Sequence, residues 1–368
     1  MFLKNAWYVA ATSKELANQN IVARTLLNEP VVIFRTEGGQ LSAVEDRCVH
    51  RHAPLSLGKV VGETIECGYH GARFDNRGRC VYIHGQQKIP SKAKIQGYPV
   101  TERHGFIWLW MGQSEKADEK MLPEPFAVAE EPHYRGRAGG ESLLLNVDYR
   151  LLADNLFDIS HAEFVHPTSF GGKKEGEYYR NARPGSEPVD RAMTYEIKER
   201  SVRFRVHVAE LTAGEGGPLF PVMMAHARNM ETWKDPINFT IEMTWWAPCY
   251  VTFGVRLRSL DPTDSLVVST HKLHCAVPCT EATTNYFYRT MVSYGGEGLI
   301  DQWIAKHQKI FAEDLRFLDG QQSRLGERDV FELPNVSFNG DQLQVAARRI
   351  LDRMIKADQP LKGLKEAV

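Results

Sequence analysis

Four residues in two short arms have the types and the spacing of a metal-cluster site. Cys48 and His50 form the first arm, and Cys67 and His70 form the second arm after sixteen intervening residues. Each arm therefore supplies one thiolate and one imidazole. Two cysteines on one iron and two histidines on the other are the ligands of a Rieske [2Fe–2S] cluster, which passes single electrons. The CxH...CxxH pattern thus predicts an electron-transfer site.

A structural zinc site is the competing interpretation, because zinc also accepts two cysteines and two histidines. Zinc fingers usually place both cysteines on one arm and both histidines on the other, whereas here each arm is mixed. Gly68 and Gly71 also allow the second arm to approach bridging sulfides closely. We therefore predict the iron–sulfur cluster, with a zinc-stabilised binding protein as the alternative.

A second group of polar residues lies in the segment DNLFDISHAEFVHP. Asp154, Asp158 and His161 are spaced by four and three residues, so they share one stripe of a predicted helix. His166 lies off that stripe, but Pro167 predicts that the helix ends there, which lets both imidazoles converge. Two histidines and one carboxylate are the protein ligands of oxygen-activating non-haem Fe(II) enzymes.

The missing carboxylate is predicted on a later helix, from about Leu299 to Leu325. The apolar stripe of this helix contains Trp303, His307, Phe311, Asp314 and Leu318. A carboxylate on such an inward-facing stripe needs a partner, and the two histidines provide one. Asp314 is therefore the preferred third iron ligand, ahead of its off-stripe neighbours Glu313 and Asp319 and ahead of Asp154.

Short β-strands must position the cluster arms. The region from Trp7 to about Trp110 alternates strand-like runs with turn signals such as EGGQ and DNRGR. We predict an all-β domain over residues 1–115, followed by a charged linker, rich in Pro and Gly, over 116–141. The predicted strands cover 21–27, 30–36, 40–46, 79–85 and 105–112.

Residues 142–368 are predicted to form the catalytic domain. A run of strands with a few helices indicates an antiparallel sheet covered by helices, which makes the fold class α+β. Helices are predicted at about 148–165, 299–325 and 341–358. Strands are predicted at 194–199, 202–210, 238–246, 250–257, 266–277 and 285–295.

The composition is that of an ordinary globular protein. The chain has 368 residues, 43% hydrophobic content and a net charge of −1 from 45 basic and 46 acidic residues, so no strong field favours nucleic acid. No run approaches about eighteen apolar residues and the N-terminus lacks an apolar signal core, so we expect a cytoplasmic protein with no membrane partner. Four further cysteines are expected to be buried thiols: Cys80, Cys249, Cys275 and Cys279.

The two motifs, in this order, resemble the Rieske non-haem iron aromatic-ring oxygenases, whose oxygenase (α) subunits carry CxHx16CxxH followed by (D/N)xxDxxHxxxxH. The resemblance covers nearly the whole chain. The branch that contains the vanillate O-demethylase and dicamba monooxygenase oxygenase subunits is most similar, through the segments FLKNAWYVAA, YHGARFDNRGRC, DNLFDISHAEFVHP and FAEDLRFLDGQQ.

The resemblance implies a Rieske domain, a helix-grip-like catalytic domain and mononuclear Fe(II) on His161, His166 and Asp314. It also implies a homotrimer in which Asp158 links a cluster histidine of the neighbouring subunit to an iron-ligand histidine. Head-to-tail contacts of this kind close into a ring by rotation. Asn155 matches a polar position near the iron in several relatives.

The implied activity is that of a terminal oxygenase component, which relays electrons from the cluster to the mononuclear iron. With O2 it would monooxygenate an aromatic substrate, in particular an aromatic acid, by O-demethylation or hydroxylation. Aromatic-ring cis-dihydroxylation is the runner-up, and an electron carrier without oxygenase activity is the third alternative. The chain has no FAD or NAD fingerprint, so we expect a separate NAD(P)H-dependent reductase to supply electrons, directly or through a ferredoxin.

The catalytic sheet and the long helix must form the substrate pocket. The candidate lining residues are His274, Trp303, Trp245 and Phe253. Because a guanidinium group binds a carboxylate well, the candidate partners of an acidic substrate are Arg205, Arg256 and Arg289.

Overall fold

The structure is a computed structural model that describes most of the chain. The described residues are 1–138, 142–166, 169, 191–211, 219–264, 267–295, 297–332, 334, 336–338 and 341–358. Pro167, on which the predicted helix end depends, and the end of the predicted linker at 139–141 lie outside them.

Three small antiparallel sheets make up the N-terminal part, which confirms the all-β prediction. One sheet has the order β1 (Ala6–Thr12), β10 (Phe106–Met111), β9 (Val100–Arg103). The next contains β2 (Ile21–Leu26), β3 (Glu29–Arg35) and β4 (Leu41–Glu45). The third contains β5 (Lys59–Val61), β6 (Thr64–Glu66), β7 (Arg73–Phe74) and β8 (Cys80–Tyr82). A short helix, α1 (Ser13–Gln19), follows β1.

One large antiparallel sheet dominates the C-terminal part. Its order is β11 (Arg135–Ala138), β18 (Thr283–Val292), β17 (Val267–Thr280), β16 (Tyr250–Ser259), β15 (Ile237–Trp246), β14 (Ser201–Leu211), β13 (Arg191–Ile197), and β12 (Leu143–Leu145) also pairs with β18. The helices are α2 (Tyr149–Phe157), α3 (Ala162–Val165), α5 (Leu219–Arg228), α6 (Glu297–Leu325) and α7 (Gln342–Asp358). This arrangement confirms the α+β fold with a helix-grip-like catalytic domain.

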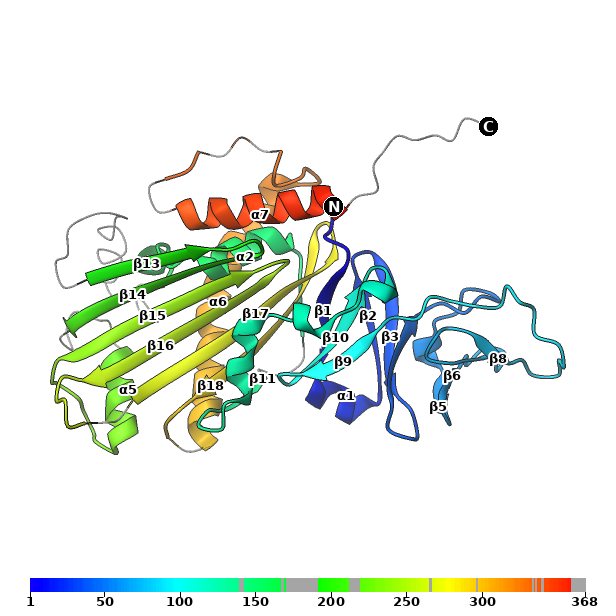
Figure 1. Cartoon of the computed structure of the whole chain (residues 1–368), viewed down its shortest axis with the longest axis horizontal. Helices are drawn as coiled ribbons and strands as arrows, with labels where there is room; N and C mark the ends of the chain where they lie inside the picture. Colours follow the sequence, from blue (N-terminus) through cyan, green and yellow to red (C-terminus); the bar gives the residue numbers. More distant parts are fainter. Residues whose placement is uncertain are drawn as a thin grey trace.

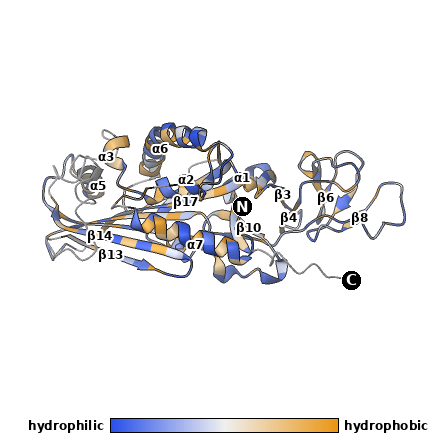
Figure 2. Cartoon of the chain, turned by 90° about the horizontal axis from the view of Figure 1, so that it is seen from above, coloured by the Kyte–Doolittle hydropathy of each residue, from blue (hydrophilic) through white to orange (hydrophobic). Residues whose placement is uncertain are grey.

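The long helix α6 lies along one face of the large sheet, and α3 lies on the same side (Figure 2). Figure 1 shows an elongated molecule in which β13 to β16 lie toward one end and β5 to β8 toward the other. In the part of the chain that the structure describes, no helix is long and apolar enough to cross a membrane.

Two apolar cores support these sheets. The larger core is continuous from β1 and β10 to the strands of the large sheet. Hydrogen bonds join the N-terminal part to the large sheet: the Tyr250 side chain donates its hydroxyl proton to the Trp7 carbonyl at 2.7 Å, and the Leu27 amide donates to the Pro278 carbonyl at 3.1 Å. The smaller core lies under the cluster arms and includes Phe34, Phe74 and the two arm cysteines. The arms therefore have a separate support.

The predicted linker is packed against the catalytic domain. A 3-10 helix, Ser114–Lys116, leads into it; it contains two more, Glu119–Met121 and Glu124–Glu130, and then β11, which pairs with β18. The side chain of Phe126 is fully buried between Phe106, Trp108 and Tyr250. Phe126, an apolar residue of this charged segment, is thus removed from water. The sheet thus begins inside the segment 116–141.

Candidate metal centres and active site

The two cluster arms adopt the same tight loop. In the first arm, the Cys48 amide donates to the Ala53 carbonyl, and the His52 amide donates to the Cys48 carbonyl, both at 2.9 Å. In the second arm, the amide of Cys67 pairs with the carbonyl five residues on, at 2.8 Å, and its carbonyl accepts from the Gly71 amide at 2.9 Å. The fifth residue of each loop has positive φ, 58° at His52 and 75° at Gly71. Both loops therefore turn back at equivalent positions.

The arms place the thiols inside and the imidazoles outside. Cys48 and Cys67 are each 2% exposed, whereas His50 and His70 are exposed, with ring centroids 4.6 Å apart. Burial raises the pKa of the Cys48 thiol, and the neighbouring Cys67 thiol raises it further. A buried thiol pair beside an exposed imidazole pair fits a two-iron cluster with one iron held by each pair.

The same four residues are too far apart for a single zinc ion. Among the described residues, the one group of three or more metal-binding side chains whose ligand atoms all lie within 4.8 Å of one another is His161, His166 and Asp314. Ligand atoms around one tetrahedral zinc ion lie closer together than this limit, because each is about 2.0–2.3 Å from the metal. The geometry of the arms therefore favours the cluster over zinc.

The second candidate metal centre is the group formed by His161, His166 and Asp314. Oδ1 of Asp314 lies 3.3 Å from Nε2 of His161 and 3.1 Å from Nε2 of His166. The histidines flank α3, one before its first residue and one after its last, and the aspartate comes from α6. Two imidazoles and a carboxylate that converge from one side fit a metal with open positions on the other.

Two other carboxylates orient the histidines. Nδ1 of His166 lies 2.8 Å from Oε2 of Glu313, which also accepts a hydrogen bond from the Ser169 hydroxyl. Nδ1 of His161 lies 3.4 Å from Oδ2 of Asp158. When Nδ1 carries the proton for these carboxylates, the Nε2 lone pair is left for a metal. Glu313 does not reach the centre as a ligand; it holds His166 in position.

The electrostatics of the group suit a cation. Burial opposes charge on His161, but hydrogen bonds to Asp158 and Asp314 raise the pKa of His161 to about 9. Burial likewise opposes charge on Asp314, but hydrogen bonds to the two histidines lower the pKa of Asp314 to about 2. Asn155 also donates its side-chain amide to Oδ1 of Asp314 at 3.2 Å. A divalent metal bound here would provide the positive charge between the carboxylate and the two imidazoles.

The prediction of one helix through this segment is wrong. Helix α2 ends at Phe157, and Asp158 has extended backbone angles, φ −102° and ψ 131°. The Asp158 side chain accepts from the Ser160 amide at 2.7 Å, a local contact that competes with helix formation. Asp154 therefore does not share a stripe with Asp158 and His161. It lies apart from the metal centre and forms an ion pair with Arg348 of α7.

A cavity of about 90 Å³ opens beside the metal centre. Of the four pocket residues predicted from the sequence, His274 and Phe253 line it. Trp245 and Trp303 are not among its described lining residues, and both pack in the large apolar core. Large aromatic side chains gain most from full burial, and Trp303 precedes Asp314 by about 16 Å of helix. The described lining residues are Asn155, Leu156, Asp158, Ile159, His161, Ala162, His166, Met243, Phe253, Lys272, His274, His307, Ile310, Phe311 and Asp314.

The three candidate arginines lie elsewhere. Arg205 pairs with Glu242 on the exposed side of the sheet, and Arg289 donates to the His104 carbonyl at 2.6 Å. Arg256 lines a separate surface depression. Among the described lining residues, the cationic side chain is Lys272. Sequence reasoning missed it, although strand alternation puts residues 272 and 274 on one face of β17.

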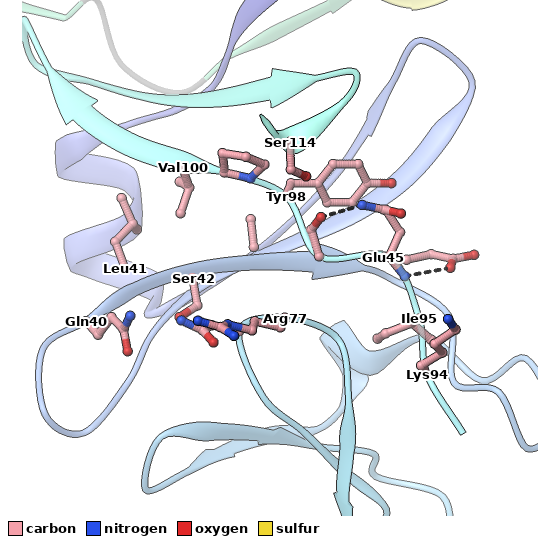
Figure 3. A pocket seen from close by; sticks show the side chains of 15 residues that line it. Gln40, Leu41, Ser42, Glu45, Arg77, Lys94, Ile95, Tyr98, Val100 and Ser114 are labelled. Carbon is pink, nitrogen blue, oxygen red and sulfur yellow. Dashed lines mark hydrogen bonds between the residues drawn. The ribbon is translucent and has the colours of Figure 1, made fainter. Parts of the chain in front are cut away.

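A larger cavity of about 800 Å³ lies in the N-terminal domain, between β4 and residues 94–100 (Figure 3). Arg77, Lys94 and Glu45 are among the side chains around it. Its described lining contains no cysteine and no histidine. It therefore offers none of the ligand types that distinguish the two metal centres.

Two family models match the chain. Residues 6–99 match the Rieske [2Fe-2S] domain, and residues 145–357 match the vanillate O-demethylase oxygenase C-terminal domain. The chain is 31% identical, over 98% of its length and 96% of the relative, to a vanillate O-demethylase oxygenase subunit from Pseudomonas sp..

Two further comparisons differ in extent. A toluene-4-sulfonate monooxygenase system iron-sulfur subunit from Comamonas testosteroni is 42% identical over 46% of this chain, and the chain spans about half of that relative, 48%. The crystal structure of dicamba monooxygenase bound to dicamba has a TM-score of 0.79 and 24% identity, covering 97% of this chain and 98% of that one. This second likeness concerns the fold.

Proposed function

The chain belongs to the Rieske oxygenases that carry the vanillate O-demethylase oxygenase C-terminal domain, and from this membership we propose that it is the terminal oxygenase component of a multi-component monooxygenase. The proposed substrate is a small aromatic acid, attacked by O-demethylation or hydroxylation. When bound, the cluster supplies single electrons and the mononuclear iron activates O2. A separate NAD(P)H-dependent reductase, directly or through a ferredoxin, is the proposed electron source.

The convergence of His161, His166 and Asp314 beside a cavity carries this proposal. Their three ligand atoms lie within 4.8 Å of one another, and each histidine has its second nitrogen paired with a carboxylate. The cavity adjoins the same three residues, so a substrate held there meets the open side of the centre. An electron carrier needs no such centre, which counts against that alternative.

Different side chains would bind the metal, orient its ligands and form the walls of the cavity. His161, His166 and Asp314 would hold the metal, while Asp158 and Glu313 keep the imidazole protons on Nδ1. Leu156, Ile159, Met243 and Phe311 give the cavity apolar walls that exclude water and accept an aromatic ring. The cluster arms would hold the [2Fe–2S] group with the two imidazoles at the surface, where an electron donor can approach.

A homotrimer is the proposed assembly. The side chains of Asp158 and His161 are 30% and 21% exposed, and the cluster histidines are exposed as well. In Figure 1 the strands β5 to β8 lie at one end of the elongated chain, and α2, which ends next to Asp158, lies beside the large sheet, away from them. A head-to-tail ring would bring the cluster of one chain to Asp158 of the next.

Iron analysis tests the proposal. We expect about three iron atoms per chain, two in the cluster and one in the mononuclear centre. The variant His161→Ala should lose one iron and all substrate-dependent O2 uptake, with an unchanged visible spectrum of the cluster. The exposed His207, changed to Ala, serves as the matched control and should keep both.

Substrate screening completes this test. O2 uptake and formaldehyde release across methoxybenzoates, chlorinated benzoates and aromatic sulfonates separate demethylation from ring hydroxylation. Two irons per chain in the fully loaded protein, or full turnover by the His161→Ala variant, would show that the mononuclear centre is assigned wrongly.

A further inference from the structure

A chain of four polar side chains forms one wall of the cavity. Nζ of Lys272 lies 3.2 Å from Nδ1 of His307, and Nε2 of His307 lies 3.0 Å from the Tyr286 hydroxyl. The same hydroxyl lies 2.7 Å from Nδ1 of His274. Lys272, His274 and His307 line the cavity, and Tyr286 joins them from β18. None of these contacts involves the proposed iron ligands.

Lys272 determines the direction of each hydrogen bond among these four side chains. An ammonium group has donors only, so His307 must accept at Nδ1 and carry its proton on Nε2. His307 then donates to the Tyr286 oxygen, and the Tyr286 hydroxyl proton goes to Nδ1 of His274. A neutral His274 must therefore carry its own proton on Nε2. The lysine sets the tautomer of a histidine two hydrogen-bonding groups away.

Burial keeps His274 and His307 neutral, as these hydrogen bonds require. Desolvation lowers the pKa of His274 to about 3, and the nearby Lys272 ammonium lowers it further. Desolvation also lowers the pKa of His307 well below its usual value, with added effects of Lys272 and His274. Both rings are 5% exposed. They are therefore able to accept hydrogen bonds at Nδ1 at neutral pH.

The cavity wall presents hydrogen-bond donors that no carboxylate accepts among the described residues. Among the described residues, no carboxylate forms an ion pair with Lys272 within 4.0 Å, and no hydrogen bond occupies Nε2 of His274. Other lining residues near this wall are apolar, including Met243, Phe253 and Phe311. A half-buried ammonium without an anionic partner is costly unless a ligand brings the negative charge.

We propose that this wall recognises the oxyanion of an aromatic acid, with Lys272 as the charged partner and the Nε2 proton of His274 as a second donor. This inference rests on the function proposed above and assigns the residues that would bind the anionic group of its substrate. His307 and Tyr286 are positioning residues, because they act by orienting His274. A carboxylate or a sulfonate has enough oxygens for both donors, and the aromatic ring then lies toward the apolar wall and the metal centre.

The charge of Lys272 adds a pH dependence. Desolvation lowers the pKa of Lys272 to about 8; Lys306 of α6 lowers it further, and Asp314 of the same helix opposes the shift. The other titratable groups that face Lys272 are His307 from α6, His274 from its own strand and Tyr286 from β18. The ammonium is present below about pH 8 and lost above it, so affinity for an anion should hold below that pH and fall above it.

Calorimetric titration of the holoenzyme tests the proposal with three probes of one shape: 4-methoxybenzoate, 4-methoxybenzenesulfonate and the neutral 4-methoxybenzamide. For Lys272→Met we expect the preference for anion over amide to fall about tenfold or more, the usual scale of a charge-assisted contact. Lys272→Arg should retain most of it. The matched control is Lys309→Met, an exposed lysine of the helix that carries His307, and it should change neither affinity.

Tyr286→Phe separates the positioning role from the charge. This variant removes the hydroxyl that links His307 to His274. His274 then no longer has a fixed tautomer, while Lys272 keeps its charge. Affinity for the anions and the amide should fall together, because both use the second donor, and the preference for anions should persist. The two anions also distinguish carboxylate from sulfonate as the better ligand.

Several outcomes would overturn the inference. These are equal loss of anion and amide binding in Lys272→Met, unchanged anion binding in that variant, or failure of the wild-type holoenzyme to bind either anion. Titration needs no turnover, so anion binding without O2 uptake would count against the proposed oxygenase function and leave this inference standing. Turnover of neutral substrates without turnover of anions would count against this inference and leave the proposed oxygenase function standing.

Discussion

Each metal-facing histidine uses its two ring nitrogens for different purposes. In both, Nε2 faces Asp314 and Nδ1 faces a second carboxylate, Asp158 for His161 and Glu313 for His166. In the proposed metal site, the second carboxylate would orient the ring and keep its proton away from the metal side. Elsewhere in the cavity a lysine would have the same effect, since donation from Lys272 to Nδ1 of His307 leaves the proton of His307 on Nε2. Charged neighbours therefore decide which nitrogen of each histidine is available.

Removing Glu313 tests this role at a single residue. The variant Glu313→Ala should bind the mononuclear iron roughly 10- to 100-fold more weakly, because His166 loses the group that orients it. The cluster spectrum should not change. Competition with an iron chelator measures the affinity, and Asp319→Ala, an exposed acid of the same helix, is the control. Unchanged iron affinity would mean that Glu313 does not support the centre.

At the scale of elements, α6 carries one wall of the site and the segment from α2 to α3 carries another. Helix α6 contributes His307, Phe311, Glu313 and Asp314 over two turns, which places all four at the cavity or the metal centre. The break after α2 lets both histidines reach Asp314. Helix α7 supports α2 through the ion pair between Arg348 and Asp154.

This ion pair predicts losses of stability of different size for its two partners. Burial raises the pKa of Asp154 to about 6 even though Arg348 lowers it, so the carboxylate depends on the arginine. Arg348→Met should lower the free energy of unfolding by about 1–3 kcal/mol, because a largely buried charge loses its partner. Asp154→Asn should cost less and keep the full iron content. Urea denaturation and iron analysis measure both, and loss of iron in Asp154→Asn would return Asp154 to the list of ligands.

At the scale of the whole molecule, the apolar core joins the two parts of the chain but leaves the cluster arms far from the catalytic centre. The arms have their own small core, at the end of the molecule away from β13 to β16 (Figure 1). The continuous core holds this separation in place, because it packs β1 and β10 against the large sheet. In the proposed ring, electrons would pass from the cluster of one chain to the iron centre of its neighbour.

Mixed trimers test that route. Chains with His70→Ala lack a complete cluster and chains with His161→Ala lack the catalytic iron, so neither alone should turn over substrate. When the two are co-expressed in equal amounts, about a quarter of the interfaces join an intact cluster to an intact iron centre, and activity should recover to about that fraction. Substrate-dependent O2 uptake measures the recovery. Mixed trimers without activity would place electron transfer within one chain.

Local patterns in the sequence were sufficient for the fold class and for the residues with the most specific chemistry. Strand alternation predicted the main strands of both domains, and helical spacing placed Asp314 on the inward stripe of α6. The arm pattern set the cluster ligand types, since each arm closes on itself within six residues. These features depend on neighbours close in the chain, which is why they are visible without a structure.

Tertiary structure alone decided the rest. Glu313 meets His166 across 147 residues and Lys272 meets His307 across 35, so no local period reveals either pair. Residue spacing also predicted that Asp154 lies beside the metal ligands. In the structure the turn at Asp158 separates Asp154 from them. The sequence by itself determined which side chains can bind metals; packing of distant elements determined which of them meet, which nitrogen each histidine offers and which cation faces the cavity.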